Sequence, residues 1–308
     1  MSTYTVKDFK SDLKPVWCPG CGDFGVLNSI YQALAQLQLP PEEVVIASGI
    51  GCSSRLPGYV STYGFNAIHG RALPIAQGVK LARPKTTVIA VGGDGDGLSI
   101  GGGHFPHMAR RNINLTYIML DNGIYGMTKG QLSPTTGGDQ QTKTTPYGVF
   151  DDPMNPLKLA LAYDASFIGR GFSGNVKQTV ELIVKAINHQ GFSFLQILSP
   201  CVTFVGRDQF DILRELIVNL PESYDPTSVD QAWKVSNEIG KISLGVIYET
   251  HRDVYEHRLE ALRKKAQKVG PTTFDGLLQD YQVSGRAHAT GAATEREEAA
   301  REYEPESP

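Results

Sequence analysis

The chain has 308 residues and a mass of 33.5 kDa, which suffices for one large domain with a smaller addition. Its 41% apolar and 20% charged residues exclude a wholly disordered chain, and its net charge of -3 excludes the basic footprint of a nucleic-acid-binding protein. No apolar run approaches the roughly 20 residues of a membrane helix, and residues 1–14 lack the apolar core of a secretory signal, so we expect a cytoplasmic protein.

The predicted elements alternate between helices and strands. Apolar residues at helical spacing indicate the helices, and short apolar runs rich in β-branched residues indicate buried parallel strands. In chain order we predict a helix at 24–37, a strand at 44–49, a helix at 72–82, a strand at 86–91, a helix at 98–111, a strand at 114–120, a helix at 156–165, a strand at 166–169, a helix at 176–190 and a strand at 193–198. This alternation predicts an α/β fold with a mostly parallel sheet covered by helices on both faces.

The chain divides into four predicted regions. Residues 1–14 form an N-terminal arm, and residues 15–206 form the α/β domain. Residues 207–283 are predicted to be a small C-terminal helical extension, which includes a charged helix at 252–268. Residues 284–308 contain almost nothing apolar except alanines, so they cannot bury enough surface to offset their ordering entropy. We therefore predict a disordered tail there.

A glycine-rich segment, Gly92–Gly97, directly follows the predicted strand at 86–91. Glycines let the backbone approach a phosphate, and ligands of such sheets bind beyond the carboxyl ends of the strands. Asp94 and Asn122 are 28 residues apart, so adjacent parallel strands place both at one edge. Their oxygens suit Mg²⁺ on a diphosphate, whereas the glycine spacing disfavours a nicotinamide dehydrogenase. The alternative is a glycine-rich turn with a helix-capping aspartate and an unrelated asparagine.

The chain contains four cysteines, Cys18, Cys21, Cys52 and Cys201, which we expect to be reduced thiols in a protein without an export signal. Cys52 and Cys201 each follow a predicted strand, at the same sheet edge as the glycine-rich segment. Four thiolates at one edge suit either a structural zinc ion or an electron-transferring [4Fe–4S] cluster. A third interpretation makes Cys52 and Cys201 buried core thiols.

Several motifs together resemble a known family. The run from Gly93-Asp94-Gly95 to Asn122 is similar to the cofactor motif of thiamine diphosphate enzymes. Over residues 15–205 the chain resembles the β subunits of the 2-oxoacid:ferredoxin oxidoreductases, and it is most similar to their 2-oxoglutarate branch. The motifs that carry this resemblance are Trp17-Cys-Pro-Gly-Cys-Gly22, Gly49-Ile-Gly-Cys-Ser-Ser54, Ile68-His-Gly-Arg-Ala72, Gly93-Asp-Gly-Asp-Gly97, Tyr125-Gly-Met-Thr-Lys-Gly-Gln131 and Ser199-Pro-Cys201.

The resemblance implies a set of cofactors and partners. The four cysteines would bind one [4Fe–4S] cluster, and Mg²⁺ would be held by Asp94, Asn122 and the backbone carbonyl of Ile124. A separate α subunit would supply the pyrimidine-binding half, and the electrons would leave to an external ferredoxin because the chain has no ferredoxin-type cysteine run. The residues implied to bind thiamine diphosphate are Gly93, Asp94, Gly95, Asp96, Gly97, Asn122, Ile124, Tyr125 and Gly126.

The resemblance also implies a reaction, the oxidative decarboxylation of 2-oxoglutarate with coenzyme A to succinyl-CoA, CO₂ and reduced ferredoxin, reversible as a reductive carboxylation. His69 is a candidate hydrogen-bonding group, and Arg71 and Lys129 are candidate cations for carboxylates or coenzyme A. Lys129 lies in the polar stretch 123–155, whose length indicates a functional or disordered loop. The alternatives are a pyruvate or broad-specificity enzyme, a non-redox thiamine diphosphate decarboxylase subunit with structural zinc, and a non-catalytic phosphate-binding protein.

Overall fold

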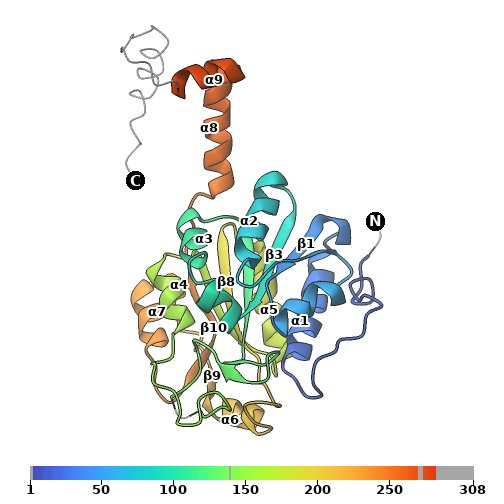
Figure 1. Cartoon of the computed structure of the whole chain (residues 1–308), viewed down its shortest axis with the longest axis vertical. Coiled ribbons are helices and arrows are strands. Elements are labelled where there is room, and N and C mark those ends of the chain that lie inside the picture. Colours follow the sequence, from blue (N-terminus) through green and yellow to red (C-terminus); the bar gives the residue numbers. More distant parts are fainter. Residues whose placement is uncertain (1–2, 139, 270–272, 282–308) are drawn as a thin grey trace. The chain divides into compact units, whose positions relative to one another are not determined.

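The computed structural model describes residues 3–138, 140–269 and 273–281, and the predicted tail at 284–308 lies outside the described residues. The chain divides into two compact units, Met1–Glu260 and Ala261–Pro308. The first unit contains an eight-stranded sheet in the order β2-β1-β3-β4-β8-β7-β10-β9, with helices on both faces (Figure 1). The predicted α/β fold with a mostly parallel sheet is therefore confirmed.

The strands of this sheet are parallel to their neighbours except where β10 meets β7. Strands β4 and β8 are buried along almost their whole length, which explains why their sequences are continuous apolar runs without alternation. The bounds are β1 (Val44–Ser48), β2 (Tyr63–Asn66), β3 (Thr87–Gly93), β4 (Leu115–Asp121), β7 (Phe167–Phe172), β8 (Phe192–Leu198), β9 (Ile217–Asn219) and β10 (Ile242–Glu249).

Two apolar cores lie on the two faces of the sheet. Successive residues of β3 point to opposite faces, so Ile89 belongs to one core and Ala90 to the other. Helices α1 (Asp23–Leu37) and α5 (Val176–Asn188) pack on the core that contains Ile89. The helices on the other core are α2 (Ala72–Ala82), α3 (Phe105–Arg111), α4 (Pro156–Ala162) and α7 (Val229–Ser236).

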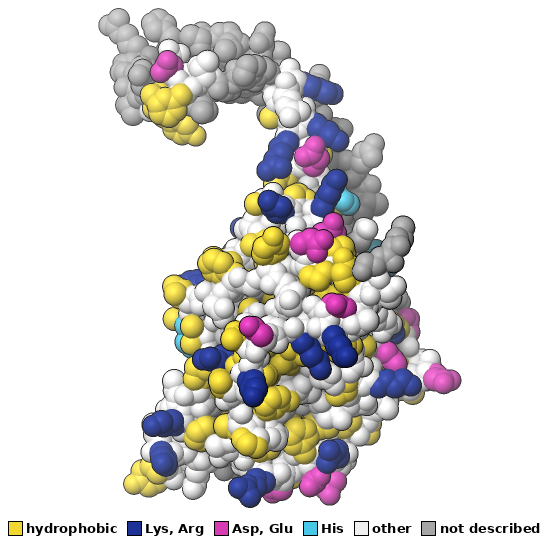
Figure 2. All heavy atoms as spheres, turned by 90° about the vertical axis from the view of Figure 1, so that its right-hand side faces the viewer, with side chains coloured by type: hydrophobic (Ala, Val, Ile, Leu, Met, Phe, Trp, Pro, Cys, Tyr) yellow, Lys and Arg dark blue, Asp and Glu magenta, His cyan; other side chains and the backbone are white. Residues whose placement is uncertain are grey.

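The remaining elements are short or lie toward the C-terminus. They are the 3₁₀ helices η1 (Pro41–Glu43) and η2 (Ser53–Tyr59), the π-helical turn η3 (Asp96–Ile100), the strands β5 (Ile124–Tyr125) and β6 (Gln131–Leu132), and the helices α6 (Gln209–Leu216), α8 (Tyr255–Val269) and α9 (Phe274–Tyr281). Among the described residues, no helix is long and apolar enough to cross a membrane. Figure 2 shows one face, on which basic, acidic and apolar side chains are interspersed.

The predicted helix at 98–111 is broken in the structure. A π-helical turn, Asp96–Ile100, is followed by turns, and α3 begins only at Phe105. The backbone of Gly101 lies so close to Gly70 that a Cβ atom on Gly70 would be 2.5 Å from the Gly101 nitrogen. Glycines permit this contact between two loops, and they also lower helix propensity, which explains the interruption.

The segment 207–283 differs from the predicted helical extension, because it also contributes two strands to the sheet. Strand β10 pairs with β7 in an antiparallel arrangement, and β9 pairs with β10. The boundary between the two compact units falls after Glu260. Strand β2 was also not predicted, because all four of its side chains are exposed and it lacks the apolar pattern of a buried strand.

The polar stretch at 123–155 begins as a small hairpin. Strands β5 and β6 pair with Ile124 opposite Leu132, so the chain returns to the end of β4. The hydroxyl of Thr136 donates a hydrogen bond to the carbonyl of Gly123 at 2.6 Å, which anchors the returning segment. This geometry places a loop that begins after β4 directly beside the carboxyl edge of the sheet.

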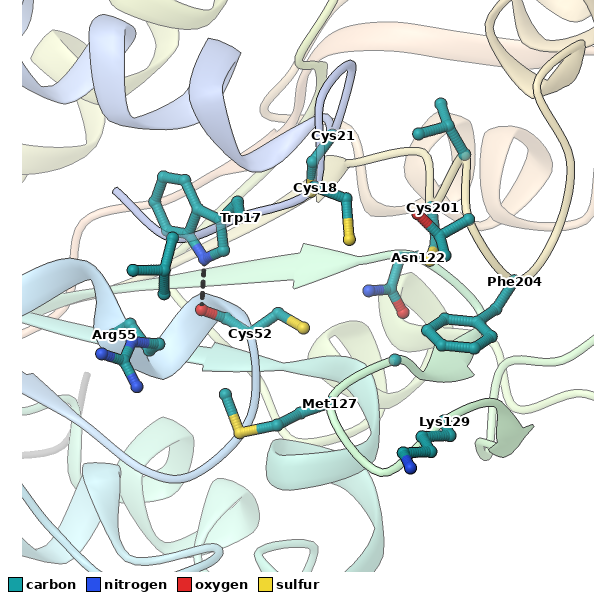
Figure 3. A pocket seen from close by; sticks show the side chains of 14 residues that line it. Trp17, Cys18, Cys21, Cys52, Arg55, Asn122, Met127, Lys129, Cys201 and Phe204 are labelled. Atoms are coloured by element: carbon teal, nitrogen blue, oxygen red, sulfur yellow. Dashed lines mark hydrogen bonds between the residues drawn. The ribbon is translucent and has the colours of Figure 1, made fainter. Parts of the chain in front are cut away.

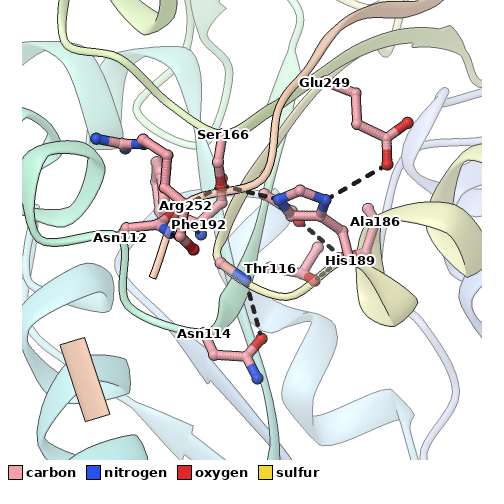
Figure 4. A network of polar contacts seen from close by, with 11 residues as sticks. Asn112, Asn114, Thr116, Ser166, Ala186, His189, Phe192, Glu249 and Arg252 are labelled. Carbon is pink, nitrogen blue, oxygen red and sulfur yellow. Dashed lines mark hydrogen bonds and ion pairs between the residues drawn. The ribbon is translucent and has the colours of Figure 1, made fainter. Parts of the chain in front are cut away.

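A buried polar network lies at the opposite edge of the sheet, where the parallel strands begin (Figure 4). His189 Nε2 is 2.9 Å from the Ser166 hydroxyl, which donates to the side-chain carbonyl of Asn112 at 2.7 Å. His189 Nδ1 is 3.5 Å from the carboxylate of Glu249 at the end of β10. A serine, a histidine and an acid suggest a catalytic triad, but Ser166 is completely buried, so no substrate reaches it. This network joins β10 to the core.

Candidate functional site

The four cysteines line a single pocket of about 290 Å³ at the carboxyl edge of the sheet (Figure 3). Cys52 follows β1 and Cys201 follows β8, whereas Cys18 and Cys21 precede α1. The indole N–H of Trp17 donates to the Cys52 carbonyl at 2.8 Å, which joins two of these segments. The fold therefore brings together thiols that are as far apart in the sequence as residues 18 and 201.

The thiols surround a space and do not converge on one point. Gly126 lies between two of them, because a Cβ atom there would be 3.4 Å from the Cys52 sulfur and 3.7 Å from the Cys201 sulfur. Among the described residues, no group of three His, Cys, Asp or Glu side chains is arranged to hold a single metal ion. A single tetrahedral zinc requires sulfur ligands only about 2.3 Å from the metal. The pocket brings together the four cysteines that either a zinc ion or a larger cluster would need as ligands.

Without a bound cation, the cysteine pocket disfavours the negatively charged thiolate form of the cysteines. Burial, followed by the charge of Asp23, raises the pKa of Cys52 to about 11, and the same two causes raise the pKa of Cys21 further. Asp23 accepts a hydrogen bond from the Ser199 hydroxyl at 2.6 Å, while its other oxygen is buried without a hydrogen-bond partner. Metal cations in the pocket would supply the charge that these groups require. Asp23 is not predicted from the sequence, because it belongs to no motif that indicates a functional role.

A second, smaller pocket of about 80 Å³ adjoins the first. Tyr125 lies across Gly95 and donates to its carbonyl at 3.0 Å, so a Cβ atom on Gly95 would be only 2.4 Å from the tyrosine ring. The two pockets share Cys52, Asn122, Gly126 and Met127. The predicted site residues that line the smaller pocket are His69, Gly93, Asp94, Gly95, Asp96, Asn122, Ile124, Tyr125 and Gly126.

Gly97 is the predicted cofactor residue that does not line this pocket. A Cβ atom at Gly97 would lie 2.0 Å from the hydroxyl of Tyr117, which is completely buried in the core under the glycine-rich segment. The close approach of Tyr117 requires a glycine at position 97, and a role of Gly97 in cofactor binding stays a prediction.

Asp94 lies at the end of β3 and is 1% exposed. One of its oxygens is 2.8 Å from the Thr135 hydroxyl, and the other accepts a long hydrogen bond of 3.4 Å from the Asn122 backbone N–H. Burial, together with the charge of Asp121, raises the pKa of Asp94 to about 7. A buried pair of acids with few donors fits a site that binds a divalent cation.

Asp96 connects three loops around the smaller pocket. One of its oxygens accepts hydrogen bonds from the backbone N–H groups of Ile50 at 2.9 Å and Gly70 at 2.8 Å, and lies 2.9 Å from His69 Nδ1. This contact leaves Nε2 as the ring nitrogen of His69 that is available to a ligand. A Cβ atom at Gly49 would lie 2.0 Å from the Asp96 carboxylate, so the close approach requires glycine there. Asp96 therefore acts on the pocket mainly by positioning His69.

The two predicted cations occupy different surroundings. Arg71 lines neither pocket, because its guanidinium lies 2.8 Å from His104 Nε2. Lys129 lines the cysteine pocket and not the smaller one, and its backbone has a φ of 78° in the turn of the β5–β6 hairpin. The structure therefore brings Lys129 to the site and holds Arg71 away from it.

A buried network behind Asp94 was not predicted. Asp121 accepts a hydrogen bond from Gln196 Nε2 at 2.7 Å, and Gln196 accepts one from Arg170 Nε at 3.0 Å. Arg170 is only 8% exposed, and burial lowers its pKa to about 10 while the charge of Asp121 opposes that shift. These residues come from β4, β8 and β7. The signal in the sequence that could have indicated this network is a polar residue within an otherwise apolar strand.

Two family models match the chain in succession. Residues 49–197 match the model described as thiamine pyrophosphate enzyme, C-terminal TPP binding domain. Residues 201–264 match the model described as pyruvate ferredoxin oxidoreductase β subunit, C terminal. The first match contains the smaller pocket and Cys52, and the second begins at Cys201.

Individual relatives agree with these matches. The β subunit of 2-oxoacid:ferredoxin oxidoreductase 2 from Aeropyrum pernix is 40% identical over 86% of this chain and 90% of the relative. The 2-oxoglutarate oxidoreductase subunit KorB from Mycobacterium tuberculosis is 49% identical over 68% of this chain and 56% of the relative. Among solved structures, the 2-oxoglutarate:ferredoxin oxidoreductase from Magnetococcus marinus, with 2-oxoglutarate, coenzyme A and succinyl-CoA bound, is 41% identical. It has a TM-score of 0.86 and covers 92% of this chain and 97% of that one.

Proposed function

This chain belongs to the β subunits of the 2-oxoacid:ferredoxin oxidoreductases, and on that premise we propose that it binds thiamine diphosphate with Mg²⁺ and one [4Fe–4S] cluster, and that its complex oxidises 2-oxoglutarate to succinyl-CoA. The observation that carries the proposal is the wall between the two pockets. Cys52, Asn122, Gly126 and Met127 line both, so a cofactor in one would be separated from a cluster in the other by only a few side chains.

Different residues of this chain have different roles at the cofactor site. The carboxylate of Asp94, the side-chain carbonyl of Asn122 and the backbone carbonyl of Ile124 would hold Mg²⁺. His69, positioned by Asp96, provides a hydrogen-bonding nitrogen at the smaller pocket. Bound thiamine diphosphate supplies the carbon nucleophile and electron sink for decarboxylation of a 2-oxoacid.

The cysteine pocket would accept electrons and pass them onward. The thiols of Cys18, Cys21, Cys52 and Cys201 would be the cluster ligands. Cys18 is exposed, so the cluster would lie near the surface, within reach of an external ferredoxin. Lys129 and Arg55 line the same pocket and supply positive charge for the carboxylate or phosphate groups of 2-oxoglutarate and coenzyme A.

A partner α subunit would complete the cofactor site. The smaller pocket holds about 80 Å³, whereas pockets for ligands of this size usually enclose about 300 Å³ or more. Exposed apolar side chains flank it, with Ile50 45%, Ile68 73% and Ile100 56% exposed. A partner that supplies the pyrimidine-binding half of the site would cover this apolar rim.

The substrate is proposed from the relatives. The relatives named for 2-oxoglutarate include KorB from Mycobacterium tuberculosis and KorB from Methanocaldococcus jannaschii, which is 36% identical over 84% of this chain. Other relatives are named only for 2-oxoacids in general, so pyruvate is the competing substrate. Comparing turnover of 2-oxoglutarate and pyruvate by the same α–β complex decides between them.

The first experiment is to measure iron, acid-labile sulfide and zinc in anaerobically purified protein together with its visible spectrum. We expect about four irons and four sulfides per chain, the composition of a [4Fe–4S] cluster, and a broad brown absorbance. About one zinc per chain without sulfide would contradict the redox function and would support a non-redox thiamine diphosphate protein.

A further inference from the structure

The hydroxyl of Thr135 lies between the two buried carboxylates of the smaller pocket's wall. Its oxygen is 2.8 Å from Asp94 Oδ2 and 2.8 Å from Asp121 Oδ1. Thr135 belongs to the segment that returns after the β5–β6 hairpin, and it is not among the residues that line the pocket. It therefore contacts Asp94, which does line the pocket, without lining the pocket itself.

One hydroxyl cannot satisfy both acids. A threonine side chain has one O–H donor, so it donates to only one ionised carboxylate at a time. The other oxygen of Asp94 accepts a long hydrogen bond of 3.4 Å from the Asn122 N–H, and the Ser133 side chain contributes a further hydrogen bond to this carboxyl group. Asp94 is therefore the acid whose remaining bonding capacity is directed toward a further positive group.

Asp121 is held more firmly than Asp94. The N–H of Gly123 donates to one Asp121 oxygen at 3.3 Å, and Gln196 donates to the other at 2.7 Å. Gln196 is itself oriented by the buried guanidinium of Arg170 at 3.0 Å. This chain of contacts fixes Asp121, and Asp121 with Thr135 fixes the position of Asp94.

We propose that Thr135 is a positioning residue for the divalent cation, because its hydroxyl, braced by Asp121, Gln196 and Arg170, holds the Asp94 carboxylate in the orientation that binds the metal. The proposal rests on the proposed function, since it concerns the cation of that cofactor site. Groups that orient a metal ligand typically contribute about 10- to 100-fold to metal affinity.

The test is the Mn²⁺ affinity of the α–β complex, with Mn²⁺ as a paramagnetic probe for the Mg²⁺ site and thiamine diphosphate present. Thr135→Val removes the hydroxyl at nearly constant volume, and we expect the dissociation constant to rise about tenfold or more. Thr135→Ser keeps the hydroxyl and should remain within about twofold of the wild type. Electron paramagnetic resonance of free Mn²⁺ measures both without any turnover.

Thr136→Val is the matched control. Thr136 is the next residue of the same loop, it is 2% exposed, and its hydroxyl donates to the Gly123 carbonyl and not to a carboxylate. Because the Thr136 hydroxyl anchors the loop without contacting a carboxylate, we expect this variant to weaken Mn²⁺ binding clearly less than Thr135→Val does. Equal weakening by Thr135→Val and Thr136→Val would mean that the loop is merely disturbed, and unchanged affinity in folded Thr135→Val would equally overturn the proposal. If the wild-type complex itself binds no Mn²⁺, the proposed function fails first, and the inference fails with it.

Discussion

Two polar networks lie at opposite edges of the same sheet, and they differ in the number of buried carboxylates that they contain. At the amino edge, Asn112, Ser166, His189 and Glu249 connect donors to acceptors within the core. At the carboxyl edge, the buried carboxylates of Asp94 and Asp121 both lie 2.8 Å from the Thr135 hydroxyl, which can donate to only one of them at a time. Burying a charge without sufficient partners is costly, so the second arrangement is retained only where something else supplies a benefit.

This difference suggests a structural role for the amino-edge network and a functional role for the carboxyl-edge network. The amino-edge network connects the end of β10 to the core through neutral side chains and Glu249, although His189 Nδ1 is buried without a hydrogen-bond partner. The carboxyl-edge network has an excess of negative charge, and it adjoins Cys21, Cys52 and Cys201, whose burial disfavours the thiolate form by raising the thiol pKa. Cations bound at the carboxyl edge would relieve both deficits, so variants at the two edges should change different properties.

The largest effect is expected for Asp94→Ala. Removing this carboxylate leaves the divalent cation without its charged ligand, so thiamine diphosphate affinity should fall about 100-fold or more and activity should be lost. The iron-dependent visible absorbance should remain, because no cysteine is touched. Titration with thiamine diphosphate and a spectrum of the same sample measure both properties.

Cys52→Ala should give the reverse result. We expect loss of the cluster absorbance and of electron transfer to ferredoxin, because one of four ligands is removed, while thiamine diphosphate still binds. Cys52 also lines the smaller pocket, so a modest change in cofactor affinity is consistent with the structure. If the Asp94 and Cys52 variants lose the same property, the assignment of separate roles to the two pockets is wrong.

The affinity of the carboxyl edge for a divalent cation should depend on pH. The folded protein raises the pKa of Asp94 to about 7, so below that pH the cation must displace a proton. We expect the Mn²⁺ affinity to be constant at higher pH and to fall by up to about tenfold per pH unit below about pH 7. Mn²⁺ titrations of the α–β complex measure this slope, and a flat profile from about pH 5.5 to 8.5 would contradict it.

The smallest effect is expected at the amino edge. His189→Ala removes a buried partner of Ser166 and Glu249, so the free energy of unfolding should fall by about 2 kcal/mol. Urea denaturation of the purified chain measures this change. The exposed neighbour His251, whose ring stacks on His189, is the matched control, and His251→Ala should cost less. A change in Mn²⁺ affinity in either variant would show that the two edges are not independent.

Most of the fold was predictable because its signals are local. The helix at 72–82 is α2 with the same bounds, and the helix at 24–37 differs from α1 by one residue. The errors fall where the local signal is weak. Strand β2 has only exposed side chains, and β10 comes from a segment predicted to be helical. Their places in the sheet depend on pairing with β1 and β7, and β7 lies about 70 residues before β10 in the sequence.

The candidate site was predictable where residues form motifs. Asp94, Asn122 and the four cysteines stand at the ends of strands or beside recognisable glycine patterns, and the structure places them around the two adjoining pockets. Arg71 belongs to the same motif as His69 but contacts His104 instead of a pocket. A motif indicates that a residue lies near a functional site. The direction in which its side chain points depends on neighbours from other elements.

The sequence by itself determined the α/β alternation, the cysteine set and the glycine-rich segment, because each depends on spacing along the chain. Only the tertiary structure decided that Thr135 lies between Asp94 and Asp121, and that Arg170 supports them through Gln196. These residues come from a loop and four strands. Hydrogen bonding in a buried site depends on distances between such elements, and those distances are set by the packing of the whole sheet.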